Sequence, residues 1–212
     1  MRVPLTSRST RRPAVRAPWV TLAVVSCSAL GLICPSLLEL SREGIARGEL
    51  WRLATGHLVH YSLYHFLVDA GTLLLIGGLY EARWGPGRWS FILLACALAI
   101  SAGFLGLEER LLAYRGLSGI DCAAFAGAIL IESRARPALG VGLAALFSAK
   151  LIYEQVSGGF LFPTFSLGEM GLPVLSAHTI GALGGFVGGL ALWPWNPNLD
   201  SSPPPAASSI SK

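Results

Sequence analysis

Six apolar stretches dominate the 212-residue sequence, at about residues 18–40, 64–80, 90–105, 116–131, 137–153 and 172–194. Several have 16–17 residues, which is near the lower limit for a helix that crosses about 30 Å of hydrocarbon at about 1.5 Å per residue. Only 13% of the residues are charged, roughly half of what a soluble domain carries. The sequence therefore predicts an all-α polytopic membrane protein, a bundle of six transmembrane helices.

Lysine and arginine lie unevenly between the two sides of the predicted membrane domain. Five of the sixteen precede the first apolar stretch, and with the N-terminus inside, the inner side holds ten and the outer side five, apart from Lys150 near the outer end of the fifth helix. Because positive residues are retained on the cytoplasmic side, we expect both termini inside. The net charge of +4 is explained by this anchoring, and nucleic-acid binding is not expected.

The chain is expected to have one membrane domain between two tails. Residues 1–17 form a basic cytoplasmic tail, residues 18–195 the membrane domain, and residues 196–212 a Pro- and Ser-rich tail that we expect to be disordered. A cleaved signal at the N-terminus is disfavoured because the apolar stretch continues past Cys27 to about Leu40. Four cysteines without a CxxC pair are expected to be small buried side chains: Cys27, Cys34, Cys96 and Cys122.

The predicted topology brings polar residues from three helices to one depth. The second, fourth and sixth helices all begin on the outer side, and near these beginnings lie His65 with Asp69, Ser118 and His178 respectively. Ionisable groups inside a membrane are costly, so they are candidates for function. A serine hydroxyl becomes nucleophilic when a base takes its proton, which makes Ser118 and His178 a candidate pair for acyl transfer.

Small residues explain how the fourth and sixth helices can meet. Every fourth residue is small from Gly119 through Ala123 to Gly127, and from Gly181 through Gly185 to Gly189. Such stripes allow two helix backbones to approach closely. Most stripes of this kind serve packing alone. Here Ser118 and His178 lie at matching ends, so packing is expected to bring hydroxyl and imidazole within hydrogen-bond reach.

With these residues in view, the sequence resembles the rhomboid family of intramembrane serine proteases. The resemblance covers about residues 49–189 and lies in Glu49-Leu50-Trp51-Arg52, His65-x-x-x-Asp69, Gly77-Gly78 with Glu81 and Gly85, Gly116-Leu117-Ser118-Gly119, and Ala177-His178-x-x-Gly181. It implies a six-helix rhomboid-like bundle. It also implies that Ser118 is the nucleophile and His178 the general base, a dyad without an acidic third member.

The supporting residues follow from the same resemblance and from the chemistry. The His65 side chain and backbone N–H groups near Gly116 and Ser118 are candidate donors to the oxyanion. Asp69 stands where many rhomboids have asparagine; because an ionised carboxylate would repel an oxyanion, we expect it either to be protonated or, preferably, to orient His65. Asp121, one turn after Ser118, is expected to bond His178 or to bridge toward the second helix, and a structural interhelical bond is equally compatible.

Within the family, Thr55-Gly56-His57-Leu58-Val59-His60 and the compact core look most like rhombosortases. That similarity implies substrates that are exported proteins with a C-terminal GlyGly-containing membrane tail. The expected location is a bacterial inner membrane, with the active site opening to the periplasm. Membrane lipid and tailed membrane proteins are the expected partners, with no cofactor and no metal.

Two other functions stay open. One is a catalytically inactive relative that binds transmembrane segments, and the other is a small metal-binding or transport protein that uses histidines and aspartates. His57 and His60, with His65, suggest a metal site, but loop hydrogen bonding is the preferred interpretation. Residues 154–171, with Gly158-Gly159 and three phenylalanines, are expected to form a mobile cap over the site.

Overall fold

The computed structural model describes residues 17–159 and 174–193 as a mainly helical chain. Its elements are α1 (Trp19–Gly31), α2 (Pro35–Leu38), β1 (Leu40–Ser41), α3 (Arg42–Ala46), α4 (Arg52–Thr55), the 3-10 helix η1 (Gly56–Leu58), α5 (Leu63–Trp84), α6 (Pro86–Leu107), β2 (Ala113–Tyr114), α7 (Ser118–Ala135), α8 (Pro137–Ser157) and α9 (Leu175–Ala191). The predicted N-terminal and C-terminal tails and most of the predicted cap lie outside these residues.

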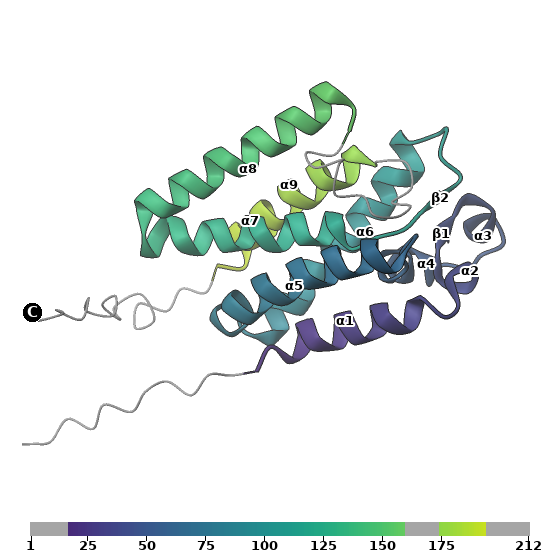
Figure 1. Ribbon diagram of the computed structural model, residues 1–212, viewed down its shortest axis with the longest axis horizontal. Coiled ribbons are helices and arrows are strands. Elements are labelled where there is room, and N and C mark those ends of the chain that lie inside the picture. Colours follow the sequence, from purple (N-terminus) through teal and green to yellow (C-terminus); the bar gives the residue numbers. More distant parts are fainter. Residues whose placement is uncertain (1–16, 160–173, 194–212) are drawn as a thin grey trace, which may run out of the picture.

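The six longer helices form an elongated bundle in which α5, α7 and α9 run opposite to α1, α6 and α8 (Figure 1). α7 lies within the bundle and contacts α5, α6, α8 and α9. Its residues are buried along most of its length, which small side chains such as Ala123 and Gly127 permit because neighbouring helices can then approach closely. The positions of the six helices agree with the six apolar stretches.

Within residues 17–159 and 174–193, three helices are long and apolar enough to cross a membrane: α5, α6 and α8. α1 and α9 are apolar but shorter, with 13 and 17 residues, and the 18 residues of α7 include Asp121, Glu132 and Arg134. A membrane protein is therefore confirmed, whereas six membrane crossings and the position of both termini inside remain predictions.

The first predicted helix, residues 18–40, is shorter in the structure than expected. α1 ends at Gly31, and α2 begins at Pro35. Proline disfavours the helical conformation in the residue before it, and Cys34 is non-helical, with φ −130° and ψ 58°. The later part of this apolar stretch therefore leaves the bundle and joins the short elements.

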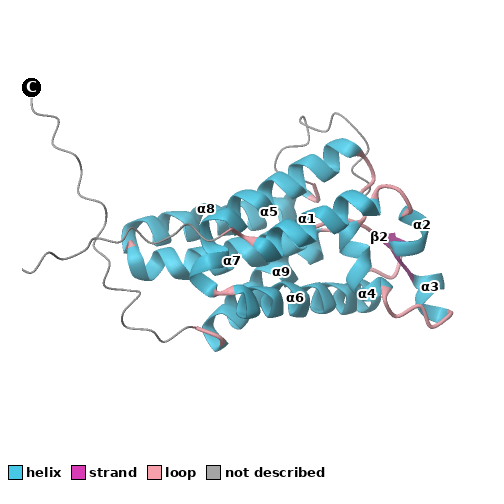
Figure 2. Cartoon of the chain, turned by 90° about the horizontal axis from the view of Figure 1, so that it is seen from below, coloured by secondary structure: helices cyan, strands magenta, loops and turns pink. Residues whose placement is uncertain are grey.

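The short elements gather at one end of the bundle (Figure 2). β1 pairs with β2 antiparallel, with Leu40 opposite Tyr114 and Ser41 opposite Ala113. Because β2 leads into the turn before α7, this pairing attaches the segment between α1 and α5 to the beginning of α7. The end of the bundle that holds Ser118 thus has a scaffold of its own.

The opposite end of α5 anchors α1. The Glu81 carboxylate accepts hydrogen bonds from the backbone N–H groups of Val20 and Thr21 and from the Thr21 hydroxyl, at 2.8–3.0 Å. These N–H groups belong to the first turn of α1, where no intrahelical acceptor exists. One turn earlier, a side chain at Gly77 would overlap Thr21. The Gly77-Gly78-to-Glu81 motif therefore serves the packing of α1 on α5.

Candidate active site

The glycine stripes of α7 and α9 bring Ser118 and His178 onto neighbouring turns. A Cβ atom at Gly181 would overlap the carbonyl oxygen of Gly119, and one at Gly119 would lie 3.0 Å from the carbonyl oxygen of Ala177. Gly185 meets Ala123 in the same way. The two backbones are therefore in direct contact on both sides of His178. The third glycines of the two stripes do not meet each other, because Gly127 faces Trp84 of α5 and Gly189 faces Leu130.

Ser118 is the first residue of α7, and His178 is the fourth residue of α9. The serine is partly accessible, whereas the histidine is buried. The two side chains make no hydrogen bond with each other in the described structure. In the absence of substrate, hydrogen bonds between a nucleophile and its base are often long. The backbone packing nevertheless places hydroxyl and imidazole on adjoining turns at the same end of the bundle.

A buried carboxylate on α8 holds the imidazole of His178. Glu154 Oε2 lies 2.9 Å from His178 Nδ1, and the Lys150 ammonium lies 2.8 Å from the same oxygen and 3.1 Å from the same nitrogen. Lys150 and Glu154 are four residues apart and thus lie on one face of α8. Glu154, which we expected in the cap loop after residue 153, belongs to α8 instead.

Of the roles that we left open for Asp121, the described structure does not contain the hydrogen bond to His178. Within the described part of the chain, it has no hydrogen bond to the histidine, and its buried Oδ1 has no hydrogen-bond partner. The carboxylate that bonds His178 is Glu154 of α8. The reason is geometric: α8 covers the Nδ1 side of His178 with a charged helical face, so an acid from a different helix reaches the imidazole.

His65, Asp69 and Gly116 come together beside the turn that carries Ser118. Asp69 Oδ2 accepts a 2.9 Å hydrogen bond from the backbone N–H of Leu117 and lies 3.2 Å from His65 Nε2. Gly116 has φ +126°, and a Cβ atom there would lie 3.0 Å from His65 Nε2 and 3.4 Å from Asp69 Oδ2. Glycine is thus required by both conformation and space. Asp69 contacts both His65 and the backbone next to Ser118, as an orienting residue would.

The His65 imidazole also packs against an aromatic ring, which in turn contacts a cation. The Tyr61 ring lies parallel to the imidazole, with centroids 6.0 Å apart, and the Arg115 guanidinium lies 5.0 Å from the centre of the Tyr61 ring. Arg115 also forms an ion pair with Glu39 at 2.6 Å. Since Arg115 directly precedes Gly116, these contacts connect the turn before Ser118 to the segment between α1 and α5.

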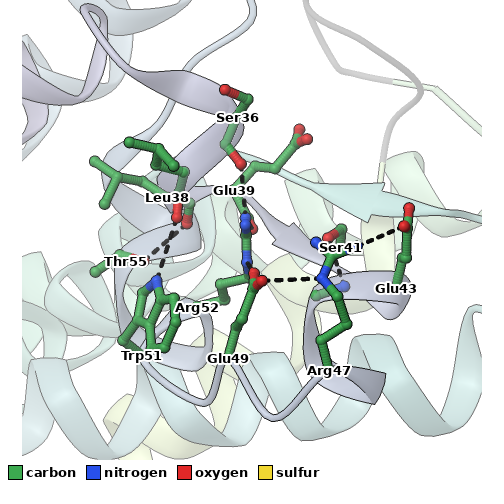
Figure 3. A network of polar contacts seen from close by, with 12 residues as sticks. Ser36, Leu38, Glu39, Ser41, Glu43, Arg47, Glu49, Trp51, Arg52 and Thr55 are labelled. Carbon is green, nitrogen blue, oxygen red and sulfur yellow. Dashed lines mark hydrogen bonds and ion pairs between the residues drawn. The ribbon is translucent and has the colours of Figure 1, made fainter.

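A network around Arg52 stabilises that segment (Figure 3). The buried guanidinium donates to the carbonyl oxygens of Ser36 and Glu39, at 2.9 and 2.7 Å, and to the Glu49 carboxylate. Thr55 donates to the carbonyl oxygen of Leu38, at 2.8 Å. Arg52 thereby bonds one carbonyl group in the short helix α2 and one at Glu39, between α2 and β1. The Glu49-to-Arg52 motif is structural support for the strand that pairs with β2.

His57 is a structural residue, as the hydrogen-bonding interpretation predicts. Its buried Nε2 lies 2.9 Å from the carbonyl oxygen of Ala97 and 3.0 Å from the Ser101 hydroxyl, both in α6. Burial lowers the pKa of the His57 imidazole to about 4, since the interior disfavours the charged form. His57 therefore joins η1 to α6 as a neutral donor.

His60 lies nearer the candidate site than we expected. Its Nε2 is 3.2 Å from Asp69 Oδ2, and its Nδ1 is 3.3 Å from the Ser28 hydroxyl. The ligand atoms of His60, His65 and Asp69 lie within 4.8 Å of one another, so these three residues are the group in the described chain that could hold a metal ion. The same Asp69 oxygen, however, is bonded to the Leu117 N–H.

Sequence reasoning missed Lys150 and Glu154 as site residues, although a signal existed. Two charges four residues apart in an apolar segment indicate a buried pair with a partner. The predicted helix end at residue 153 concealed the spacing.

The cysteine prediction was wrong for Cys27 and Cys34, which are exposed, while Cys96 and Cys122 are buried. In an apolar environment a small thiol can remain on the helix surface.

Comparison with known proteins agrees with this geometry. The model of the rhomboid domain matches residues 47–195, more than half of the chain. Rhomboid protease GlpG of Photorhabdus laumondii is 28% identical over 148 residues, which are 68% of this chain and 48% of that protein. The chain thus spans about half the length of this relative. The match includes α5 to α9 and every candidate residue of the site, and the chain belongs to the rhomboid family of intramembrane serine proteases.

Proposed function

We propose that this protein is an intramembrane serine endopeptidase in which Ser118 is the nucleophile and His178 the general base. The observation that carries the proposal is the backbone contact of Gly119 with Ala177 and Gly181, which sets Ser118 beside the turn of His178. The partial accessibility of Ser118 suits a group that must reach a substrate. The burial of His178 suits a base whose orientation must be maintained.

The chemical steps follow from the residues present. Ser118 Oγ attacks the carbonyl carbon of the scissile peptide while its proton moves to His178 Nε2. The resulting imidazolium then protonates the leaving amine, and a water molecule hydrolyses the acyl-enzyme by the reverse roles. This sequence requires the neutral imidazole to carry its hydrogen on Nδ1, which is the nitrogen that faces Glu154.

The oxyanion needs donors close to Ser118. The first N–H groups of α7 have no intrahelical acceptor, so those of Ser118 and Gly119 are suitable donors. The Leu117 N–H is already bonded to Asp69 and serves to hold the turn. His65 is a further donor in this proposal, and its contact with Asp69 sets the orientation of the ring.

The substrates that we propose are exported membrane proteins with a GlyGly-containing C-terminal tail. The similarity of residues 55–60 to rhombosortases supports this class, and the N-in orientation would place the site on the periplasmic side of a bacterial inner membrane. The tail would enter at the end of the bundle where Ser118 lies. Apolar side chains such as Leu50 and Trp51 are exposed there and are suited to a lipid interface.

The test compares the C-terminal ends of tailed exported proteins in cells with the wild-type protein or Ser118→Ala. Loss of processing in the variant, at equal membrane levels of both proteins, is the expected result. Identical ends in both cells would exclude the GlyGly-tail substrates. Processing that a chelator stops while Ser118→Ala remains active would instead support a metal function at His60, His65 and Asp69.

A further inference from the structure

We propose that Glu154 is a positioning residue that maintains His178 in the tautomer with hydrogen on Nδ1, and that Lys150 is the cation that orients Glu154. This inference rests on the proposed function, because the tautomer matters only if His178 Nε2 takes a proton. It extends the expected Ser118–His178 dyad to a relay of Ser118, His178 and Glu154, in which the acid comes from α8.

Among the described residues, two neighbours compete for His178 Nδ1. The carboxylate of Glu154, 2.9 Å away, can only accept, so it requires hydrogen on Nδ1. The ammonium of Lys150, 3.1 Å away, can only donate, so it requires a lone pair on Nδ1. One nitrogen cannot satisfy both at once. The choice between these neighbours therefore determines which tautomer His178 adopts.

The carboxylate is the stronger of the two neighbours. Both contacts involve an ionised group, but the contact of Glu154 with Nδ1 is the shorter, at 2.9 Å against 3.1 Å. Lys150 has a second acceptor at 2.8 Å, the same Glu154 oxygen, and is satisfied without Nδ1. With Nδ1 protonated, Nε2 carries the lone pair that must accept the Ser118 proton.

Other polar groups around His178 do not replace Glu154 in this role. On α7, Cys122 is a neutral, weak donor, and its Sγ lies 3.9 Å from the Lys150 ammonium. Asp121 makes no hydrogen bond to His178 within the described residues. On α9, Ser176 donates to Glu108, the residue after α6, at 2.6 Å, and not to His178 or Glu154. Among these groups, Glu154 has the charge and the distance that the tautomer requires.

The same contacts explain what happens during the transfer. As the bond between Ser118 Oγ and the carbonyl carbon forms, the Oγ proton passes to His178 Nε2, and the imidazole becomes a cation. The Nδ1 hydrogen stays in place and is bonded to Glu154, which remains ionised. The positive charge then lies beside the Glu154 carboxylate, which stabilises it, while Lys150 keeps the carboxylate in position.

The test uses the full chain in lipid vesicles, with histidines labelled with ¹⁵N and a fluorophosphonate as the serine-reactive probe. The ¹⁵N shifts report which nitrogen of His178 carries hydrogen, and the His178→Gln variant assigns the signal. We expect the wild-type protein to carry hydrogen on Nδ1. If hydrogen lies on Nε2 in the wild-type protein, the proposal is overturned whatever the variants do.

Two variants separate positioning from structure. In Glu154→Ala, Lys150 is the described neighbour of Nδ1 that remains, so we expect the Nε2–H tautomer and a maximal labelling rate lower by about 100- to 10,000-fold, as for a histidine in the wrong tautomer. Probe affinity should stay unchanged. In Lys150→Met/Glu154→Ala, the ammonium that favours a lone pair on Nδ1 is removed as well, and labelling should recover by about tenfold relative to Glu154→Ala, which is about 1.4 kcal/mol.

Gln155→Ala is the matched control, because Gln155 also joins α8 to α9, through Thr179 at 2.9 Å, without contacting His178. Its tautomer and labelling should equal those of the wild-type protein. An unchanged tautomer in Glu154→Ala, or no recovery in the double variant, would contradict the proposal. If the wild-type protein is not labelled at Ser118, the proposed function fails. If the wild-type protein is labelled and Glu154→Ala is labelled at the same rate, only the role of Glu154 is rejected.

Discussion

At the scale of the residue, the candidate site depends on hydrogen bonds that two buried acids make beside Ser118 and His178. Asp69 Oδ2 accepts from the N–H of Leu117 next to Ser118, and Nδ1 of His178 lies 2.9 Å from Glu154 Oε2. The two acids differ in how far the sequence predicts their roles. The spacing of Asp69 to His65 predicts an orienting role. The acid that bonds His178 depends on how α8 packs against α9, and no spacing within one helix reveals that.

Asp69→Asn should retain the fold, because an amide oxygen can accept from the Leu117 N–H in place of the carboxylate. Asp69→Ala leaves that buried N–H without an acceptor, and we expect a loss of about 1–3 kcal/mol in the free energy of unfolding. Unfolding in detergent measures both variants, with the wild-type protein as reference. Equal destabilisation by asparagine and alanine would show that the hydrogen bond to Leu117 is unimportant.

His57 should make stability depend on pH. The imidazole has a pKa of 6.5 when exposed and about 4 in the folded protein, so between these values the unfolded chain binds more protons. Stability should therefore be full above pH 6.5 and fall by up to about 3 kcal/mol as the pH decreases toward 4. The measurement is the difference in unfolding free energy between wild-type protein and His57→Asn across this range. A constant difference would contradict the assignment of His57 as a buried neutral donor.

At the scale of the element, the contact between α7 and α9 positions Ser118 and His178, the proposed reactive residues. The stripes of small residues predicted this contact correctly at Gly119, Gly181 and Gly185, since a repeat of four residues in a helix produces one face. The prediction was wrong at Gly127 and Gly189, because the bulky Trp84 side chain lies against both glycines and Leu130 of α7 lies against Gly189.

Gly181→Ala should separate α7 from α9, because its Cβ atom would overlap a backbone oxygen that cannot move by itself. We expect a loss of about 1–3 kcal/mol in unfolding free energy and a strong decrease in labelling of Ser118. Gly188→Ala is the matched control on the same helix, since its Cβ atom would meet Ile92 at an ordinary 3.7 Å. Equal behaviour of the two variants would refute the close backbone contact as the positioning device.

Arg52→Lys tests the segment between α1 and α5. Lysine retains the charge but cannot reproduce the fork that bonds two carbonyl oxygens and Glu49, so a loss of about 1–3 kcal/mol is expected. Arg47→Lys is the control, because Arg47 also pairs with Glu49 but has a side chain that is 51% exposed; it should have no measurable effect. Thermal unfolding compares the two, and an Arg52→Lys protein as stable as Arg47→Lys would refute the network's role.

At the scale of the whole molecule, helix order and helix direction could be predicted from the sequence, and helix length could not. Alternating direction follows from short connections between apolar stretches, and it already places His65, Ser118 and His178 at one end. The early end of α1 and the short elements that follow it depend on Pro35 and on tertiary bonds to Arg52. The late end of α8 depends on Glu154 finding a buried partner on α9.

The proposed function requires Ser118 and His178 to act as one reactive pair. The direct test is labelling of the purified protein in lipid with a fluorophosphonate, followed by identification of the modified residue by mass spectrometry. The label should lie on Ser118, be absent in Ser118→Ala, and form far more slowly in His178→Ala. Equal labelling of the wild-type protein and Ser118→Ala, or none in either, would contradict this account.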